Sequence, residues 1–509
     1  MEADQPVVAT DQQSVQTKPV QTEPIQTKSV QVKNERFDLP QSHIDETESS
    51  GAGKSAAKAP TSLVLRLLGM DRNREFKRLI PWASKGGLAI LDQGLISGSN
   101  FLVSVLLARW MAPAQYGAYA VALSIYVLLS IMYQSLVLEP MAVFGGSSYR
   151  HCLRGYLSSL LWIHAVASIA IFVAFGASAV AARGMAHSGG LAGALAGVTI
   201  ASPCILAFAL ARRGFYLDLS PAKAAGGAFV YSGVSLGALY VLYHRGLLSA
   251  FSAFLLMGLA ALATTVYLLI RLRSELPTTG VAPDLRETWK RHWSYGRWAL
   301  ASAVAGYIPA YVYYPLLSSF GSLAQSGQLR ALMNLTLPME QTKAALGMLL
   351  LPYAARVHDQ QGRSSATSLS VRMTMISLGG AIAYWILILP LHGPVFHLLY
   401  SGRYMEVASL LPIVAFGSIV WSAAYGPAIA LRAMESPASV FVAFSLATVL
   451  SLLIGVPATW AFGLKGAIWG SNLADVLSLV FVVVVLRRKI ISHSQSQENL
   501  VSWKGATLE

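Results

Sequence analysis

Charged and hydrogen-bonding side chains interrupt a long apolar stretch that begins at Arg330. Arg330, Asn334 and Gln341 fall on one face of a helix, and Glu340 lies three residues before Lys343, close enough to form an ion pair. Charge inside so apolar a stretch is costly, so it is expected to face protein or water. The pattern predicts either a site that binds an anionic group without covalent chemistry or an internally neutralised structural pair.

A second polar stripe precedes it in the chain. The spacing of four, three and four residues places Gln93, Ser97, Asn100 and Ser104 on one helical face. Such a stripe either lines a hydrated path or joins neighbouring helices through hydrogen bonds between small polar residues. Both interpretations stay open at this point.

Three tyrosines form an aromatic stripe. Tyr307, Tyr311 and Tyr314 are spaced by four and three residues, with prolines nearby. Aromatic faces can stack on sugar rings, and prolines can kink a helix. The same stripe is also typical of ordinary aromatic packing.

Further ionisable or polar residues mark the ends of apolar stretches or lie within them. Asp92 and Glu139 are either boundary charges or a gate that pairs with loop arginines, and Arg109 is either an interface anchor or a contact for a phosphate group. Asn472 and Asp475 are three residues apart, which suits a coupling cation or a helix–helix hydrogen bond.

The composition indicates which elements must position these residues. The chain has 509 residues, of which 54% are hydrophobic and only 12% are charged, whereas a soluble chain carries about 25% charge. Apolar runs of about 20 residues recur, and each is long enough to cross a bilayer as a helix. Strands of strict alternation that would suit a barrel are not found in the sequence. The predicted fold is therefore all-α and integral to a membrane.

Twelve spans are expected. Lys and Arg are concentrated in alternate loops: with the N-terminus inside, 25 fall on the inner side and 6 on the outer side, which predicts that both termini are cytoplasmic. Because the basic residues lie in short loops, nucleic acid is a poor partner. The spans are predicted at 88–108, 117–138, 155–178, 190–211, 226–243, 249–270, 296–317, 330–353, 373–392, 408–430, 437–461 and 465–486.

The N-terminal residues have a different character. Residues 1–60 are polar and include a five-residue repeat, "SVQTKPVQTEPIQTKSVQVK", so they are expected to be disordered, and no signal peptide is recognised there. Residues 61–85 are apolar and then basic, which predicts an interfacial amphipathic segment; a poorly ordered linker is the alternative. The two cysteines give no disulfide framework and no metal motif.

An internal repeat relates the two halves. "APAQYGAYAVALS" (112–124) aligns with "SLAQSGQLRALMN" (322–334) at an offset of 210 residues, each on the outer side after the first span of a half. Equal halves of six spans imply a pseudo-two-fold axis along the membrane normal and a substrate cavity between the halves. The predicted organisation is a tail (1–60), an interfacial segment (61–85), two bundles (86–270 and 296–488), a cytoplasmic linker (271–295) and a second cytoplasmic tail (489–509).

The sequence also resembles a known family. "LDQGLISGSNFLVSVLLARWMAPAQYGAYAVALS" (91–124) resembles the start of polysaccharide-exporting lipid flippases of the multidrug/oligosaccharidyl-lipid/polysaccharide exporter superfamily, and residues 404–437 and 462–489 resemble its C-terminal half. The resemblance implies two six-helix bundles around a central cavity. It also implies transfer of isoprenoid-diphosphate-linked oligosaccharides across the bacterial inner membrane, for export of exopolysaccharide or O-antigen-type glycans, by alternating access.

The resemblance gives the polar residues roles without making the protein an enzyme. The implied partners are the lipid-linked oligosaccharide, membrane lipids, and polysaccharide polymerase and export proteins; no cofactor is expected beyond coupling to a proton or sodium gradient. The expected substrate-binding residues are Gln93, Asn100, Arg109, Tyr311, Tyr314, Arg330, Asn334, Gln341 and Lys343, and the expected gating or ion-coupling residues are Asp92, Glu139, Glu340, Asn472 and Asp475.

Two other functions compete with this one. A membrane polysaccharide polymerase or ligase would be expected to carry catalytic residues on a large outer loop, and every predicted outer loop is short. A cation-coupled multidrug antiporter of the same superfamily would favour acidic residues within the spans, whereas this chain has a mixed set that includes Arg330 and Lys343.

Overall fold

Long helices account for most of the chain in the computed structural model, which describes residues 75–184, 189–217, 221–275, 283–434 and 437–506. The described part contains no strand. The predicted tail 1–60 and most of the predicted segment 61–85 lie outside the described residues. The predicted all-α membrane fold is confirmed, because ten of the described helices are long and apolar enough to span a bilayer, or eleven when a bent pair is counted as one span.

The N-terminal bundle contains six of these spans, and two of them are formed by consecutive helical segments. In one, α3 passes through the π-helical turn η1 into α4, and in the other the short 3-10 turn η2 (Arg150–Cys152) leads into α5. The bundle consists of α2 (Glu75–Trp110), α3 (Pro113–Tyr133), η1 (Gln134–Leu138), α4 (Glu139–Gly146), α5 (Leu153–Arg183), α6 (Gly189–Leu217), α7 (Pro221–His244) and α8 (Ala250–Glu275).

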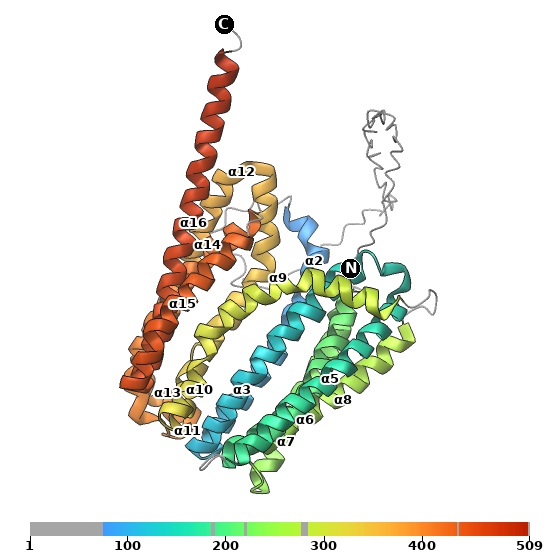
Figure 1. The fold of residues 1–509 in the computed structure, drawn as a ribbon, viewed down its shortest axis with the longest axis vertical. Helices are drawn as coiled ribbons and strands as arrows, with labels where there is room; N and C mark the ends of the chain where they lie inside the picture. The colour runs from blue at the N-terminus through green and yellow to red at the C-terminus, as the bar shows by residue number, and fades with distance from the viewer. Residues whose placement is uncertain (1–74, 185–188, 218–220, 276–282, 435–436, 507–509) are drawn as a thin grey trace, which may run out of the picture. The chain divides into compact units, whose positions relative to one another are not determined.

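The C-terminal bundle is less regular. Residues 330–353, predicted as one span, are divided between α11 and α12, and α12 continues through the predicted loop into the next span, arching over at the top of Figure 1. The bundle consists of α9 (Leu285–Tyr311), α10 (Tyr313–Phe320), α11 (Leu323–Asn334), α12 (Leu337–Ile388), α13 (His392–Tyr400), α14 (Leu411–Ala433), α15 (Pro437–Phe462) and α16 (Leu464–Ala506).

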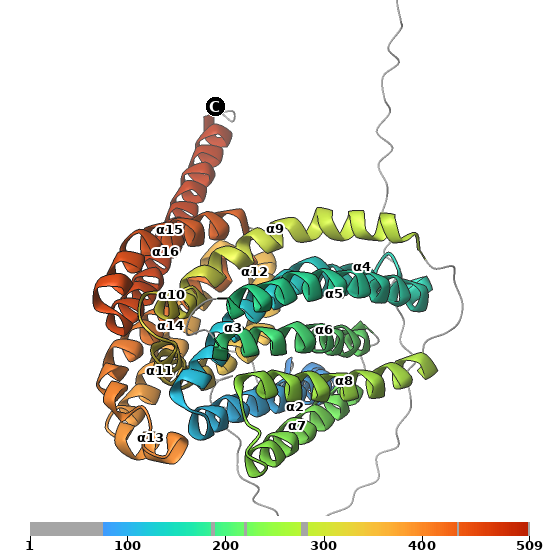
Figure 2. The ribbon, with the colours of Figure 1, turned by 60° about the horizontal axis from the view of Figure 1, so that its bottom comes forward.

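Helix α9 connects the two bundles. Asp284 caps its first turn by accepting a hydrogen bond from the Glu287 amide at 3.2 Å. Its first half packs against η1 and α5, and its second half packs against α15 and α16. Figure 2 shows α9 running along the N-terminal helices before it reaches α15. The bundles are therefore joined by a continuous helix at this point, and the linker predicted at 271–295 includes the first turns of α9.

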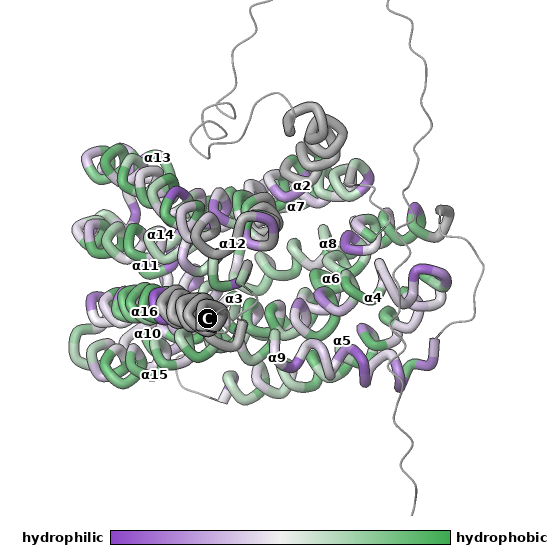
Figure 3. Tube along the Cα trace, turned by 90° about the horizontal axis from the view of Figure 1, so that it is seen from above, coloured by the Kyte–Doolittle hydropathy of each residue, from purple (hydrophilic) through white to green (hydrophobic). Residues whose placement is uncertain are grey.

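The surface carries many large apolar side chains. On α5, for example, Trp162, Val166, Ile169, Phe172 and Val173 are all more than half exposed. Figure 3 shows hydrophobic residues along the outward-facing helices. This arrangement suits contact with lipid, because an exposed apolar belt of this kind would be unfavourable in water.

The buried core is shared by the bundles at one end only. At the joined end, where α3 and α11 begin, one apolar cluster includes Tyr116 and Ala118 together with Leu329, Leu332 and Ile468. At the other end, the divided end, each bundle has its own clusters. The loop charges predict that the joined end faces outward and the divided end faces the cytoplasm.

Candidate functional site

An arginine surrounded by tyrosines lies where the two bundles meet. Helix α11 carries Arg330, and the tyrosines near it are Tyr116 and Tyr119 of α3, Tyr311 at the end of α9, and Tyr314 of α10. The hydroxyls of Tyr116 and Tyr314 are within hydrogen-bonding reach of the guanidinium. Both bundles therefore contribute to one site, which we call the tyrosine–arginine cluster.

The positive charge of Arg330 is not neutralised by a carboxylate within the part of the chain that the structure describes. The side chain is only partly buried, and its Nε atom has no hydrogen-bond partner among the described residues. A guanidinium presents several donors in a planar fork that suits phosphate oxygens. The cluster can therefore bind an anionic group by charge-assisted hydrogen bonds.

A buried hydrogen-bonded triangle lies beside this cluster. Ser104 of α2 donates to Asn334 Oδ1 at 3.0 Å, Asn334 Nδ2 donates to the Tyr116 hydroxyl at 3.0 Å, and Ser104 and Tyr116 are 3.1 Å apart. All three side chains are buried. Asn334, predicted to contact substrate, thus both accepts and donates a hydrogen bond that joins the bundles in this conformation.

The polar stripe of α2 forms a chain of hydrogen bonds toward the divided end. Gln93 donates to Ser97 at 3.1 Å, and Ser97 donates to Gln341 of α12 at 2.8 Å. The Ser97–Gln341 bond links the two bundles. Asn100 instead accepts a hydrogen bond from Tyr231 of α7 at 3.2 Å, within its own bundle.

Asp92 forms a strong contact inside the N-terminal bundle. Its carboxylate is buried and accepts bonds from Arg212 of α6 at 2.8 and 2.5 Å, and from the Tyr216 hydroxyl. Arg212 also donates to Gln93 at 3.0 Å. In this conformation Asp92 therefore anchors α6 to α2, and within the described part of the chain its link to the other bundle runs through Arg212, Gln93 and Ser97.

A group of opposite charges lies within the C-terminal bundle. Lys343 of α12 is buried, forms a 2.7 Å ion pair with Glu340 and lies 3.4 Å from the hydroxyl of Ser422. Asp475 of α16 interacts electrostatically with both Glu340 and Lys343. We call Glu340, Lys343 and Asp475 the acid–lysine group; it has two carboxylates for one ammonium.

Of the remaining predicted residues, Arg109 and Glu139 lie apart from these groups, whereas Asn472 lies beside Asp475, since both side chains would contact a Cβ atom at Gly417 of α14. Arg109 donates to the Leu398 carbonyl of α13 at 3.0 Å, and Asn472 donates to the Ile413 carbonyl of α14 at 2.7 Å. Glu139 at the start of α4 lies in the electrostatic field of Arg213 from α6 and Arg432 from α14. Glu139 is therefore influenced by both bundles near the divided end.

The tyrosine stripe leads from α9 into the cluster. The rings of Tyr307 and Tyr311 stack with centroids 5.0 Å apart, and Tyr311 and Tyr314 are 6.2 Å apart. The Tyr307 hydroxyl donates to the Ser124 carbonyl of α3 at 2.5 Å. The stripe continues the contact between bundles, and Tyr311 and Tyr314 both lie near Arg330.

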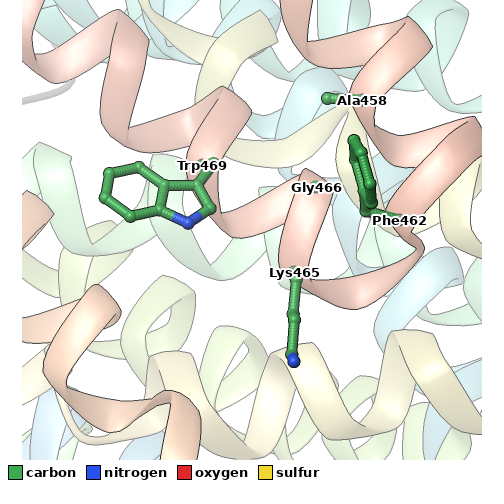
Figure 4. A pocket seen from close by; sticks show the side chains of 5 residues that line it. All are labelled: Ala458, Phe462, Lys465, Gly466 and Trp469. Carbon is green, nitrogen blue, oxygen red and sulfur yellow. The ribbon is translucent and has the colours of Figure 1, made fainter.

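A surface pocket occurs elsewhere. Figure 4 shows Phe462 and Trp469 on either side of Gly466, with Lys465 beside them. All of its lining residues belong to α15, α16 or the turn between them. Because neither α3 nor α11 contributes to this pocket, it is separate from the tyrosine–arginine cluster.

Comparison with solved structures identifies the architecture. A lipid II flippase MurJ in an inward closed conformation has a TM-score of 0.64 at 10% identity, covering 79% of this chain and 87% of that one. A multidrug resistance MATE family transporter of the MOP superfamily, in an inward-facing conformation, has a TM-score of 0.60 at 12% identity, covering 81% and 95%.

The chain has the fold of MOP superfamily transporters. A third such structure, from Pyrococcus furiosus and described by a binding pocket of reverse polarity, has a TM-score of 0.59 at 11% identity, covering 86% of this chain and 99% of that one. No family model matches the sequence, and no curated protein matches it. This shared fold accounts for the two bundles. At 10–12% sequence identity the similarity extends to the fold.

Several residues of the site were not predicted from the sequence. Tyr116 and Tyr119 lie inside the repeat at 112–124, but neither their charge nor their spacing indicates that they are site residues. Arg212 and Arg213 follow an apolar run and resemble ordinary boundary residues. The repeat was the one feature of the sequence that could have indicated Tyr116 and Tyr119, because it places the start of α3 and the start of α11 in equivalent positions.

Proposed function

We propose that this protein is a flippase for isoprenoid-diphosphate-linked oligosaccharides and works by alternating access in a bacterial inner membrane, with both termini cytoplasmic. The observation that carries the proposal is the tyrosine–arginine cluster: one cation without a carboxylate partner among the described residues, between two bundles of a transporter fold. Translocation of a diphosphate requires a fixed positive charge to replace water, and hydroxyl-bearing aromatic residues suit sugars.

The cycle would exchange one set of contacts between bundles for another. In the present conformation the bundles share a core at the joined end, so a substrate would enter from the divided end. The Ser97–Gln341 bond and the charges around Glu139 would part as substrate enters. The buried triangle of Ser104, Tyr116 and Asn334 would open in the opposite conformation, which would free Asn334 to contact the substrate.

The acid–lysine group is proposed as the coupling site. Two carboxylates and one ammonium cannot all be neutralised without a further cation or a bound proton. A proton or a sodium ion that binds there would link the C-terminal bundle to an ion gradient. Arg109 and Gln341 are proposed as additional substrate contacts along the seam, and a polysaccharide polymerase and export proteins as the consumers of the product.

A multidrug cation antiporter is the second candidate. It is favoured by the carboxylates of the acid–lysine group and by the MATE family structures that share the fold. The two candidates differ in the charge of the substrate. An antiporter for organic cations would be hindered by Arg330, whereas an exporter of diphosphates would require it.

Reconstitution in liposomes distinguishes the two. Purified protein is supplied with a fluorescent isoprenyl-diphosphate oligosaccharide or, separately, with tetraphenylphosphonium. Arg330→Gln should slow flipping of the diphosphate about tenfold or more, because a charge-assisted bond contributes on the order of 1.5–3 kcal/mol. Arg183→Gln, at an exposed site on α5, is the matched control. Uptake of tetraphenylphosphonium that increases in Arg330→Gln, without any diphosphate flipping by the native chain, would support the antiporter instead.

A further inference from the structure

The first half of α9 presents a stripe of cations and tryptophan on its exposed side. Arg286, Lys290, Trp293 and Arg297 follow one another at intervals of four, three and four residues, so they lie on one side of the helix. Trp289 joins this stripe through Trp293, with ring centroids 6.3 Å apart. All five side chains are exposed, with Trp289 and Trp293 at 40% and 46%. We call these five residues the α9 face.

Another side of the same helix is fixed to the N-terminal bundle. Thr288, His292 and Gly296 are the buried residues in the first half of α9. The two ring nitrogens of His292 bond the Tyr156 hydroxyl at 2.7 Å and the Leu136 carbonyl at 3.0 Å. A side chain at Gly296 would come within 2.5 Å of the Ser135 carbonyl oxygen. These contacts are made to the π-helical turn η1 and to α5, and they set the rotation of α9, so that the α9 face points away from the bundle.

The cations of the α9 face have no carboxylate partner among the described residues. The one acidic residue in the first turns of the helix, Glu287, is paired with Arg291 at 2.6 Å. Arg286, Lys290 and Arg297 therefore keep their positive charge available. Tryptophan prefers the level of lipid headgroups, and basic residues near it are attracted to an anionic leaflet.

We propose that the α9 face binds the headgroups of anionic phospholipids at the divided end of the N-terminal bundle. Charge complementarity and the two tryptophans favour a lipid over an acidic protein segment, since an acidic peptide would not require aromatic rings at headgroup level. This lipid site does not depend on the transported substrate. Because α9 packs against both bundles, lipid bound there would act on the helix that connects them.

Quenching of tryptophan fluorescence by brominated lipid tests the proposal in the full chain. Protein is placed in phosphatidylcholine nanodiscs that contain a small, equal fraction of either brominated phosphatidylglycerol or brominated phosphatidylcholine. We expect stronger quenching by the anionic lipid. The double variant Lys290→Gln/Arg297→Gln should reduce the preference on the order of tenfold. The matched control, Arg487→Gln/Arg488→Gln at exposed positions within α16, should keep it.

Three results would overturn the proposal. One is an unchanged preference in Lys290→Gln/Arg297→Gln, and another is an equal loss in the α16 control. The third is a preference that is absent in the full chain and arises only after deletion of residues 1–60. That segment holds nine Asp and Glu against six Lys and Arg, and this result would make it the occupant of the α9 face. If the double variant does not fold, Trp289→Phe/Trp293→Phe replaces it, and the excess quenching by anionic lipid should then disappear.

Discussion

Gly117 of α3 and Gly327 of α11, equivalent residues of the internal repeat, contact each other where the two bundles meet. A Cβ atom at Gly327 would lie 2.8 Å from the Pro113 carbonyl oxygen and 3.0 Å from the Gly117 nitrogen, and one at Gly117 would overlap the backbone of Leu323. The pseudo-two-fold axis implied by the repeat therefore passes close to this pair.

The neighbouring glutamines obey the same symmetry. Gln115 accepts a hydrogen bond at 3.2 Å from the amide of Ala250, at the turn between α7 and α8. Gln325 lies against Gly463, in the turn between α15 and α16. Each glutamine thus contacts the turn between the last two helices of its own bundle. This equivalence supports the alignment of the two halves with contacts far from the repeat in sequence.

Alanine at either central glycine should disrupt the joined end. Gly117→Ala and Gly327→Ala are expected to separate α3 from α11 and to lower the thermal unfolding temperature. Gly94→Ala and Gly98→Ala are the controls, because nothing lies within 4 Å of a Cβ at either position. Alanine favours a helix over glycine by about 1 kcal/mol, so the controls should be at least as stable as the native chain. Equal stability of all four variants would contradict a tight crossing.

Loss of the Lys343 ammonium should destabilise the acid–lysine group. Lys343→Met leaves Glu340 and Asp475 without their cation. Because the Glu340 side chain is 37% exposed, the loss of stability should be smaller than the about 3–5 kcal/mol that breaking a fully buried pair costs. We expect less folded protein in the membrane. The double variant Glu340→Gln/Lys343→Met should restore its amount, measured by fluorescence size-exclusion chromatography.

An exposed ion pair provides the control for the Lys343 variant. Arg291→Gln breaks an exposed pair with Glu287, which should cost no more than about 1 kcal/mol. If the acid–lysine group couples transport to an ion, the restored double variant will be abundant but will no longer respond to an imposed gradient. A double variant that responds normally would remove this group from coupling.

A cross-link between Ser97 and Gln341 should stop alternation. The two side chains bond at 2.8 Å across the bundles, so a short bifunctional thiol reagent should link Ser97→Cys to Gln341→Cys in a background without Cys152 and Cys204. Transport should fall and return after the link is cleaved. The matched pair is Leu95→Cys/Ser232→Cys, which lies within one bundle, where Ser232 bonds the Leu95 carbonyl at 3.1 Å. Equal inhibition by both pairs would show that rigidity alone, rather than locking of the bundles, is responsible.

The orientation of the chain can be measured directly. Reporter fusions after residues 115, 185 and 247 should report the outer side, because the loop count of Lys and Arg places these turns there. Fusions after residues 150 and 275 provide the inside controls. A cytoplasmic signal from two of the first three positions would reverse the assignment of the joined end.

The sequence by itself determined the membrane character, the helices and the repeat. Apolar runs determine helices locally, since each backbone hydrogen bond of a helix joins residues four positions apart. Lipid also permits few other backbone conformations. The pair of Glu340 and Lys343 was predictable for the same reason, because three residues of helix separate them. The boundary between the predicted spans at 330–353 and 373–392 was not, because the polar residues there continue α12 instead of forming a loop.

Only the tertiary structure decided which distant groups meet. Asp92 pairs with Arg212 120 positions later, Arg330 lies among tyrosines of both bundles, and His292 docks on the turn that contains Leu136. Nothing in the local pattern selects these partners, since each depends on how long apolar helices rotate against one another. That rotation is set by the summed packing of many side chains and by close contacts such as Gly117 against Gly327.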